Sequence, residues 1–305
     1  MSDRAAIAYY AQHSTTPWNE KLRFALRQLY FTRGRGSPLW TLLSSARWPV
    51  HPRLVCKTLE APQRLFYDWR YGYAQRLSAI CDHYRFVLER LPAALAQPLL
   101  QLQAVPVFVY TGKGGQDYAL QLRIDHQMEK EGSLTLELVC QAVAVLRCTW
   151  HLAEASDGWV LRVGGLQSTN TDTQQQIRQA TKDFHGIQPR ILMLQALKAL
   201  GQTLGLGRIE AVPTAWHVYS SRRYRKNIAA DYDQLWTFLG FARSPQGAFA
   251  TDTVLAIKDL EDCPSHKRSE YRRRNDRLLQ LQQQLAQIFQ EARAAAEGAS
   301  ERGGL

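Results

Sequence analysis

Five consecutive segments between residues 105 and 166 alternate apolar and polar side chains with a period of two. They read VPVFVY, YALQLRID, SLTLELV, VLRCTWHL and WVLRVGGL. In the second segment, for example, Tyr118, Leu120 and Leu122 alternate with Ala119 and Gln121. Successive side chains of an extended strand point to opposite faces, so each segment has one apolar face and one solvent-exposed face. The pattern predicts successive antiparallel strands.

Helical periodicity dominates on both sides of these segments. Before residue 95, NEKLRFALRQLY and YAQRLSAICDHYRFVLERL carry apolar residues at spacings of three and four. After residue 165, ILMLQALKALGQTLG is apolar nearly all round, which indicates a buried helix with Pro189 in its first turn. RIEAV and GAFATDTVLAIKDL predict further strands, and AADYDQLWTFLGF predicts a short helix between them.

A long basic helix is expected from Ser265 onward, with Leu278, Leu281, Leu285 and Ile288 on one face. Four large apolar side chains are costly to leave in water, so this stripe should pack against the body of the protein or against a second copy. A homodimer through this helix is therefore one expectation. The fold class is α+β, with a helical N-terminal region (1–95), a mixed, mostly antiparallel sheet flanked by helices (96–262), and a basic C-terminal helix with a flexible tail (263–305).

The charge balance narrows the choice of partners. The 305 residues carry a net charge of +11, which favours polyanions such as nucleic acid, anionic lipid or an acidic carrier protein. The five cysteines are widely spaced without a CxxC pair, so neither a disulfide framework nor a metal site is expected, and a cytoplasmic location fits best. Residues 91–112 are uncharged, but the prolines and glutamines among them argue against a transmembrane segment, and we interpret them as a connector into the first strand.

Three motifs in the second half of the chain resemble the VirK/YbjX family of bacterial proteins. They are IRQATKDFHGIQPRILMLQAL, IEAVPTAWHVYSSRRYRKNIAADYDQLW and HKRSEYRRR. The likeness extends over most of the chain, roughly from Trp18 to Leu285. The resemblance implies a family linked with virulence and envelope phenotypes, without an assigned biochemical activity.

The order of elements after residue 158 also resembles the second half of a GNAT acyltransferase, so we expect the sheet to be GNAT-like. In that family two neighbouring strands splay apart, the pantetheine of the acyl donor lies between them, and the pyrophosphate binds the next helix N-terminus. The resemblance places this anion site at HGIQPR, with His185, Gly186 and Arg190. The glycine pair of the family's pyrophosphate loop is missing, and the tyrosine of its FYEKLGF-like stretch corresponds to Trp236. A general acid would then come from another residue, such as Tyr219, Tyr232 or His217.

His217 lies between a tryptophan and a tyrosine in TAWHVYSSRRYRK, just beyond a predicted strand end. A histidine in this position is either a satisfied core residue or a group that moves a proton near neutral pH. Asp231 or Asp233 could orient its ring, as carboxylates do in histidine-based acyl transfer. Gln167, at the end of a predicted strand, would hold a substrate amide or satisfy a buried backbone group.

Four cationic side chains follow the histidine, namely Arg222, Arg223, Arg225 and Lys226. On a helix, Arg222, Arg225 and Lys226 would share one side with Tyr219 and form a phosphate-binding surface; otherwise they form a solvated face.

The favoured hypothesis is a GNAT-like acyltransferase that moves an acyl or aminoacyl group to a peptide or envelope precursor. The donor would be an acyl carrier protein, a charged tRNA or acyl-CoA, with no tightly bound cofactor. The alternative is a non-catalytic GNAT-like module that binds nucleic acid, anionic lipid or a protein partner.

Overall fold

The computed structural model describes residues 3–124, 128–169, 173–224 and 230–302. Helices build the first third of the chain: α1 (Asp3–His13), α2 (Trp18–Thr32), α3 (Pro38–Ser44), α4 (Pro52–Glu60), α5 (Tyr73–Glu89) and α6 (Ala93–Leu100). The later helices are α7 (Thr173–Asp183), α8 (Pro189–Thr203), α9 (Tyr232–Phe238) and α10 (Arg268–Arg302). Contrary to the connector interpretation, residues 91–112 include the short helix α6. No helix in these ranges is long and apolar enough to cross a membrane.

The described residues form one mixed, eight-stranded sheet with the order β1-β2-β3-β4-β5-β6-β8-β7. Its strands are β1 (Val105–Thr111), β2 (Asp117–Arg123), β3 (Leu134–Cys140), β4 (Val143–Ala155), β5 (Gly158–Ser168), β6 (Arg208–Ala211), β7 (Ala242–Arg243) and β8 (Phe249–Asp252). The first five strands form an antiparallel meander, as the alternating segments predict. β6 is parallel to β5 because α7 and α8 carry the chain back between them.

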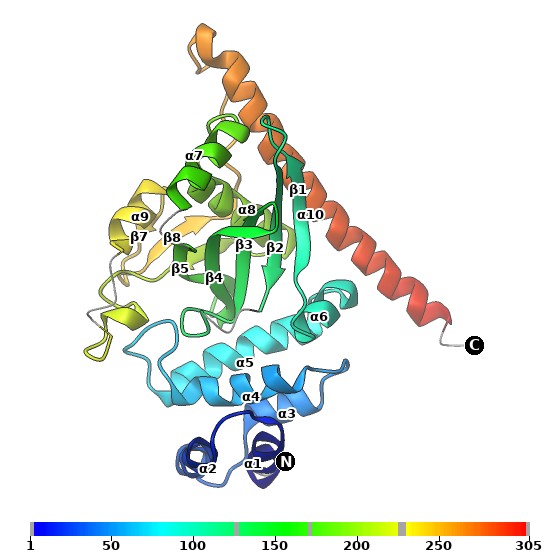
Figure 1. Cartoon of the computed structure of the whole chain (residues 1–305), viewed down its shortest axis with the longest axis vertical. Coiled ribbons are helices and arrows are strands. Elements are labelled where there is room, and N and C mark those ends of the chain that lie inside the picture. The colour runs from blue at the N-terminus through cyan, green and yellow to red at the C-terminus, as the bar shows by residue number, and fades with distance from the viewer. Residues whose placement is uncertain (1–2, 125–127, 170–172, 225–229, 303–305) are drawn as a thin grey trace.

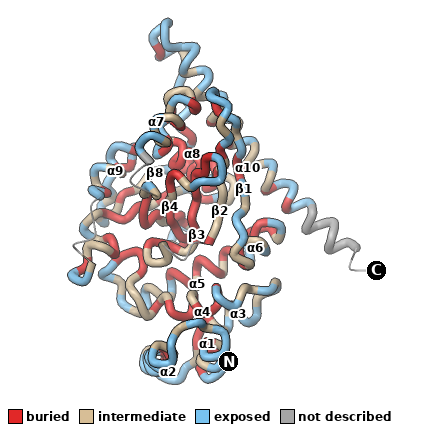
Figure 2. The backbone as a smooth tube through the Cα atoms, in the orientation of Figure 1, coloured by how far each residue is buried: buried red, intermediate tan, exposed pale blue. Residues whose placement is uncertain are grey.

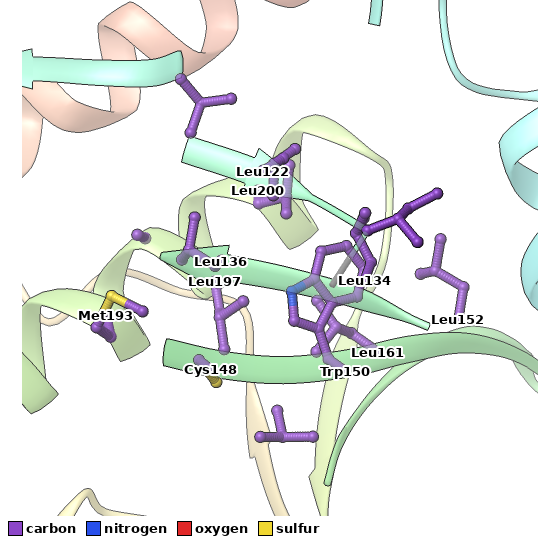
Figure 3. Packing of buried hydrophobic residues seen from close by; sticks show 14 of the residues in the cluster. Leu122, Leu134, Leu136, Cys148, Trp150, Leu152, Leu161, Met193, Leu197 and Leu200 are labelled. Carbon is purple, nitrogen blue, oxygen red and sulfur yellow. The ribbon is translucent and has the colours of Figure 1, made fainter. Parts of the chain in front are cut away.

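The main core lies between the sheet and α8 (Figure 3). Met193, Leu197 and Leu200 of α8 face Leu136 and Trp150 of the sheet, and all five side chains are buried. α8 is apolar nearly all round because it is covered by α10 as well as by β3, β4 and β6. α5 packs against β4, α1 to α4 lie beyond it at the lower end of the molecule, and α6 lies beside β1 and α10 (Figure 1).

The long helix α10 runs beside β1 and contacts α6 and α8 (Figure 1). Its leucine stripe is buried in these contacts, which confirms the expectation that it packs against the body of the protein. The stripe contains Leu278, Leu281 and Leu285 as expected, but it continues through Phe289, while Ile288 is only half-buried. A step of four residues from Leu285 keeps Phe289 on the buried face, because the helix has 3.6 residues per turn.

Candidate active site

Strands β5 and β6 run side by side over only four residue pairs. Their parallel register joins Val160 to Arg208 at one end and Val163 to Ala211 at the other. The backbone N–H of Val212 donates to Val163 O at 3.1 Å, after which the two strands separate. β5 continues to Ser168 beside β4, so its other edge is left without a neighbouring strand. Two parallel strands that diverge are the feature that the resemblance to GNAT enzymes implies.

Glu131 occupies the space beside β5 where β6 has departed. It belongs to the connection between β2 and β3, and it has no exposed surface. A Cβ atom added to Gly164 would lie 1.8 Å from the Glu131 backbone oxygen. A Cβ atom added to Gly165 would lie 2.3 Å from Glu131 Oε2. The two glycines of WVLRVGGL therefore leave the room that a buried carboxylate fills.

The Glu131 carboxylate faces two side chains from other parts of the chain. Gln167 Nε2 donates to Oε1 at 2.6 Å, and His217 Nε2 lies 3.3 Å from the same oxygen. Oε2 has no hydrogen-bond partner among the described residues. The His217 ring is 1 % exposed, and its Nδ1 accepts a hydrogen bond from the Tyr219 backbone N–H at 3.3 Å. Since Nδ1 accepts this hydrogen bond, Nε2 is the ring nitrogen that is left to donate, and it faces Glu131.

Aromatic rings enclose the histidine. The Tyr232 ring stacks on His217 with centroids 4.6 Å apart, and the Tyr219 ring lies at 5.4 Å. Burial and the nearby Glu131 charge raise the pKa of both tyrosines, that of Tyr232 well above its ordinary value. Both hydroxyls are therefore neutral at pH 7. Trp236, at the position of the GNAT tyrosine, is a core residue whose Nε1 donates to Val212 O at 2.8 Å.

A segment from the helical region holds both sides of this site. Tyr67 N donates to Lys130 O at 2.7 Å, which fixes the chain next to Glu131. Trp69 N donates to Trp216 O at 3.0 Å, next to His217. The stretch FYDWR thus ties together two loops that are far apart in the sequence, and it gives the N-terminal helices a role in positioning the site.

The basic run after His217 begins in a turn. Arg222 and Arg223 are exposed, and Tyr224 N closes the turn on Ser221 O at 3.0 Å. The described part of the run is therefore not the helix that we considered above. Lys130 Nζ donates to the Tyr224 hydroxyl at 3.2 Å, so the turn folds back toward the loop that carries Glu131. Arg225 and Lys226 lie outside the described residues.

His185 and Gly186 lie in the turn after α7 and do not belong to the first turn of α8. The Gly186 N–H donates to Thr181 O at 2.7 Å, so it is not directed at an anion. α8 begins at Pro189, and Arg190 is exposed in its first turn. Burial, together with neighbouring cationic side chains, lowers the pKa of His185. Among the described residues, His185, Gly186 and Arg190 share no contact with Glu131 or His217. The resemblance had placed the anion site of the donor at these three residues.

The two aspartates that were candidates to orient His217 have other partners. Asp231 is the N-cap of α9 and accepts from Gln234 N at 3.0 Å. Asp233 accepts from Thr214 N at 2.7 Å and forms an ion pair with Arg243. Asp231 satisfies a free N–H group at the helix start, and Asp233 fixes the Thr214 backbone to α9. The carboxylate beside His217 is that of Glu131.

A row of polar side chains crosses the sheet next to the site. Gln121 pairs with Glu137, Glu137 with Arg147, and Arg147 with Gln167 on four successive strands. Burial raises the pKa of Glu137, but hydrogen bonds from Arg147 and Gln121 outweigh it and lower the pKa below its ordinary value. Gln167 therefore links this row to the Glu131 carboxylate. Its amide nitrogen orients a side chain of the site, the Glu131 carboxylate.

Metal-binding side chains do not gather anywhere in the described residues, where no group of three or more histidine, cysteine or acidic side chains could hold an ion. The five cysteines are free thiols.

Four of the predicted residues, His217, Gln167, Tyr219 and Tyr232, lie together around Glu131 in the structure. Sequence reasoning missed Glu131, because each of the two glutamates in the stretch MEKEGS resembles an ordinary solvated loop residue. The glycine pair at residues 164 and 165 was the available signal. Glycine inside a strand marks a place where another part of the chain approaches closely.

The fold and the site define an α+β protein with a buried glutamate–histidine pair at the divergence of two parallel strands. The chain belongs to the family DUF535, described as proteins of unknown function, whose model matches residues 14–287. It is 29 % identical to the uncharacterized protein YbjX of Escherichia coli over 275 residues, which is 88 % of this chain and 82 % of YbjX. It is 31 % identical to the membrane protein LapB of Mannheimia haemolytica over 150 residues, or 48 % of this chain and 62 % of LapB.

Among solved structures, the chain is similar to a cAMP-binding acyltransferase from Mycobacterium smegmatis. The sequences are 11 % identical, the match covers 69 % of this chain and 61 % of the other, and the TM-score is 0.31. The chain thus spans about three fifths of that protein.

Proposed function

We propose that this protein is a GNAT-like acyltransferase of the bacterial cytoplasm that acts on a peptide or envelope precursor. The observation that carries the proposal is the Glu131 carboxylate, which is buried at the divergence of β5 and β6 with Oε2 unpartnered among the described residues. A buried carboxylate oxygen without a hydrogen bond is costly and needs a reason. Capturing a proton from a substrate is such a reason.

In the proposed reaction, the acceptor amine or hydroxyl attacks the acyl carbonyl carbon of the donor. Glu131 Oε2 takes the proton from the attacking group as the new bond forms. The bond to the donor sulfur or oxygen then breaks, its electron pair stays on that atom, and the proton returns from Glu131 to it. His217 and Gln167 keep the carboxylate in place through Oε1.

The donor's anionic part would bind the basic turn. Arg222 and Arg223 are exposed there, close in sequence to Tyr224, which contacts Lys130. Cationic side chains suit the phosphates of coenzyme A, of tRNA or of an acyl carrier protein. These three donors share the same chemistry at this surface, so the assay has to offer all of them.

The test is single-turnover transfer from a panel of acyl-CoA, acyl carrier protein and aminoacyl-tRNA donors to amine acceptors. Glu131→Gln should lower the rate by about a hundredfold or more, and His217→Gln should lower it by roughly tenfold. His83→Gln is the matched control, because His83 is equally buried but bonds to Leu152 N at 3.3 Å, away from the site. Full turnover by a folded Glu131→Gln protein would disprove the proposed role.

One observation favours a second function, that of a binding module without catalysis. Glu131 and His217 are almost completely buried, and the Glu131 backbone itself fills the space between the diverging strands. In that case the pair would fix the loops that carry Lys130 and Arg222. Binding of polyanions without turnover of any donor would support this function.

A further inference from the structure

Helix α2 exposes more large apolar side chains than any other described helix. Trp18 is 72 % exposed, Leu26 is 59 % exposed and Tyr30 is 76 % exposed. Leu22 and Leu29 are also exposed. At 100° per residue these five side chains fall on one side of the helix, so they form a continuous apolar stripe, called here the α2 stripe.

The orientation of α2 is fixed by contacts on its opposite side. Phe24 stacks on Tyr10 of α1 with centroids 3.9 Å apart. The buried carboxylate of Asp3 accepts hydrogen bonds from Gln28 Nε2 at 3.1 Å and from Thr32 Oγ1 at 2.8 Å. These buried polar contacts favour one orientation of the helix, because rotating it would break both of the hydrogen bonds that α2 donates to the buried Asp3 carboxylate. The α2 stripe therefore faces outward as a consequence of the packing.

Cationic side chains border the stripe. Between residues 18 and 36 the chain contains five arginines and lysines and a single carboxylate, Glu20, which pairs with Arg23. Arg27, Arg33 and Arg35 are exposed and form no ion pair with any described residue. An apolar face bordered by unpaired cations complements a surface of acyl chains below anionic headgroups.

The position of α2 in the molecule suits contact with such a surface. Figure 1 places α1 and α2 at the lower end of the molecule, with every other described element on one side of them. Figure 2 shows most of α2 as exposed. Trp18 in the first turn and Tyr30 in the last turn are residue types that favour the boundary between water and lipid.

We propose that α2 docks the protein onto an anionic lipid bilayer, with the α2 stripe inserted among the headgroups and the arginines paired with lipid phosphates. The proposal is independent of catalysis at Glu131, since the α2 stripe shares no residue with that site. It makes the protein a peripheral membrane protein held by one surface helix.

The experiment is co-sedimentation of the full chain with vesicles of phosphatidylcholine alone and with vesicles containing about one-third phosphatidylglycerol. The wild type should bind the anionic vesicles at least about fivefold more tightly, and salt should weaken this binding. The double variant Leu22→Gln/Leu26→Gln should bind at least about tenfold more weakly. The variant Arg27→Gln/Arg33→Gln should lose affinity for the anionic vesicles only.

Phe238→Gln is the matched control, because Phe238 is 56 % exposed on α9 and should not affect vesicle binding. All substituted side chains are exposed, so the melting temperature should stay unchanged; if the double variant unfolds, Trp18→Ala replaces it. Equal binding by the wild type and the α2 variants would overturn the proposal. A wild-type dimer that the α2 variants convert to a monomer, without a change in vesicle binding, would instead assign the stripe to a second copy of the chain.

Discussion

Glu131 Oε1 and His217 Nε2 lie 3.3 Å apart, and neither residue is more than 1 % exposed. Glu131 comes from the loop between β2 and β3, and His217 follows β6, so the pair joins the meander to the part of the sheet beyond the parallel crossover. Both groups are held by further contacts, Glu131 by Gln167 and His217 by the Tyr219 backbone. The predictions below test this site, its basic turn and the elements that support it.

Glycine at position 164 should be required for the Glu131 loop to pack against β5. A Cβ atom there would meet the Glu131 backbone oxygen at 1.8 Å, and backbone cannot move aside as a side chain can. We expect Gly164→Ala to lower the free energy of unfolding by about 2 kcal/mol or more, measured by urea denaturation. Gly207→Ala is the control, because a Cβ atom at Gly207 meets nothing within 4 Å. Equal stability of the two variants would mean that Glu131 does not pack against β5.

Acid should destabilise the fold through its buried histidines. Burial lowers the pKa of His83 from 6.5 to about 3, and it lowers the pKa of His151 well below its ordinary value. The unfolded chain binds protons at these positions below about pH 6.5, whereas the folded protein does not, so stability is full above pH 6.5 and falls toward pH 3. For His83 the loss is on the order of 4 kcal/mol.

Urea unfolding between pH 7.5 and pH 4 measures this loss. His83→Gln removes one titrating group, so the variant should be less stable at neutral pH but should lose stability less steeply in acid. Parallel pH profiles for the two proteins would rule out a contribution from His83.

The buried stripe of α10 should stabilise the whole protein. Leu281 is completely buried, so Leu281→Ala should cost about 2 to 5 kcal/mol of unfolding free energy. Leu279 is 41 % exposed on the same helix, and Leu279→Ala should cost less than about 1 kcal/mol. Thermal or urea unfolding of the two variants compares the same chemical change on two faces of one helix. A similar cost at both positions would contradict the packing of α10 described above.

The basic turn should bind anions locally and not only through net charge. We expect Arg222→Ala/Arg223→Ala to weaken binding of a polyanion such as tRNA by roughly tenfold, and added salt should weaken wild-type binding as well. Arg272→Ala/Arg273→Ala removes the same charge from exposed positions on α10 and serves as the control. Equal losses in a filter-binding titration of both variants would indicate a general charge effect.

Much of the fold could be predicted because it rests on local periodicity. The alternation in YALQLRID and SLTLELV identified β2 and β3, and the apolar surface of ILMLQALKALGQTLG identified α8 as a buried helix. In each of these elements, the spacing of apolar residues along the sequence shows directly which side chains are buried. α6 was missed because its prolines hid a short helix, in which Pro98 lies close to the C-terminal end.

The site could be predicted only in part. The position of His217 just past a strand end was informative, but its carboxylate partner depends on a contact between distant loops, which sequence spacing does not report. Asp231 and Asp233 were nearer in sequence and were therefore the natural candidates. The contact of Asp231 with the start of α9 follows from local capping chemistry that was available from the sequence, whereas the contact of Asp233 with the Thr214 backbone spans nineteen residues and was not.

The packing of α10 against β1 and α6 has a consequence for how the chain folds during its synthesis. The meander from β1 to β5 consists of neighbouring hairpins, which can form as soon as they leave the ribosome. The apolar surface that α10 covers stays uncovered until α10 has been translated. Between the synthesis of α8 and that of α10, a nascent chain therefore exposes a hydrophobic surface along β1 and α8, and chaperones would bind it during this interval.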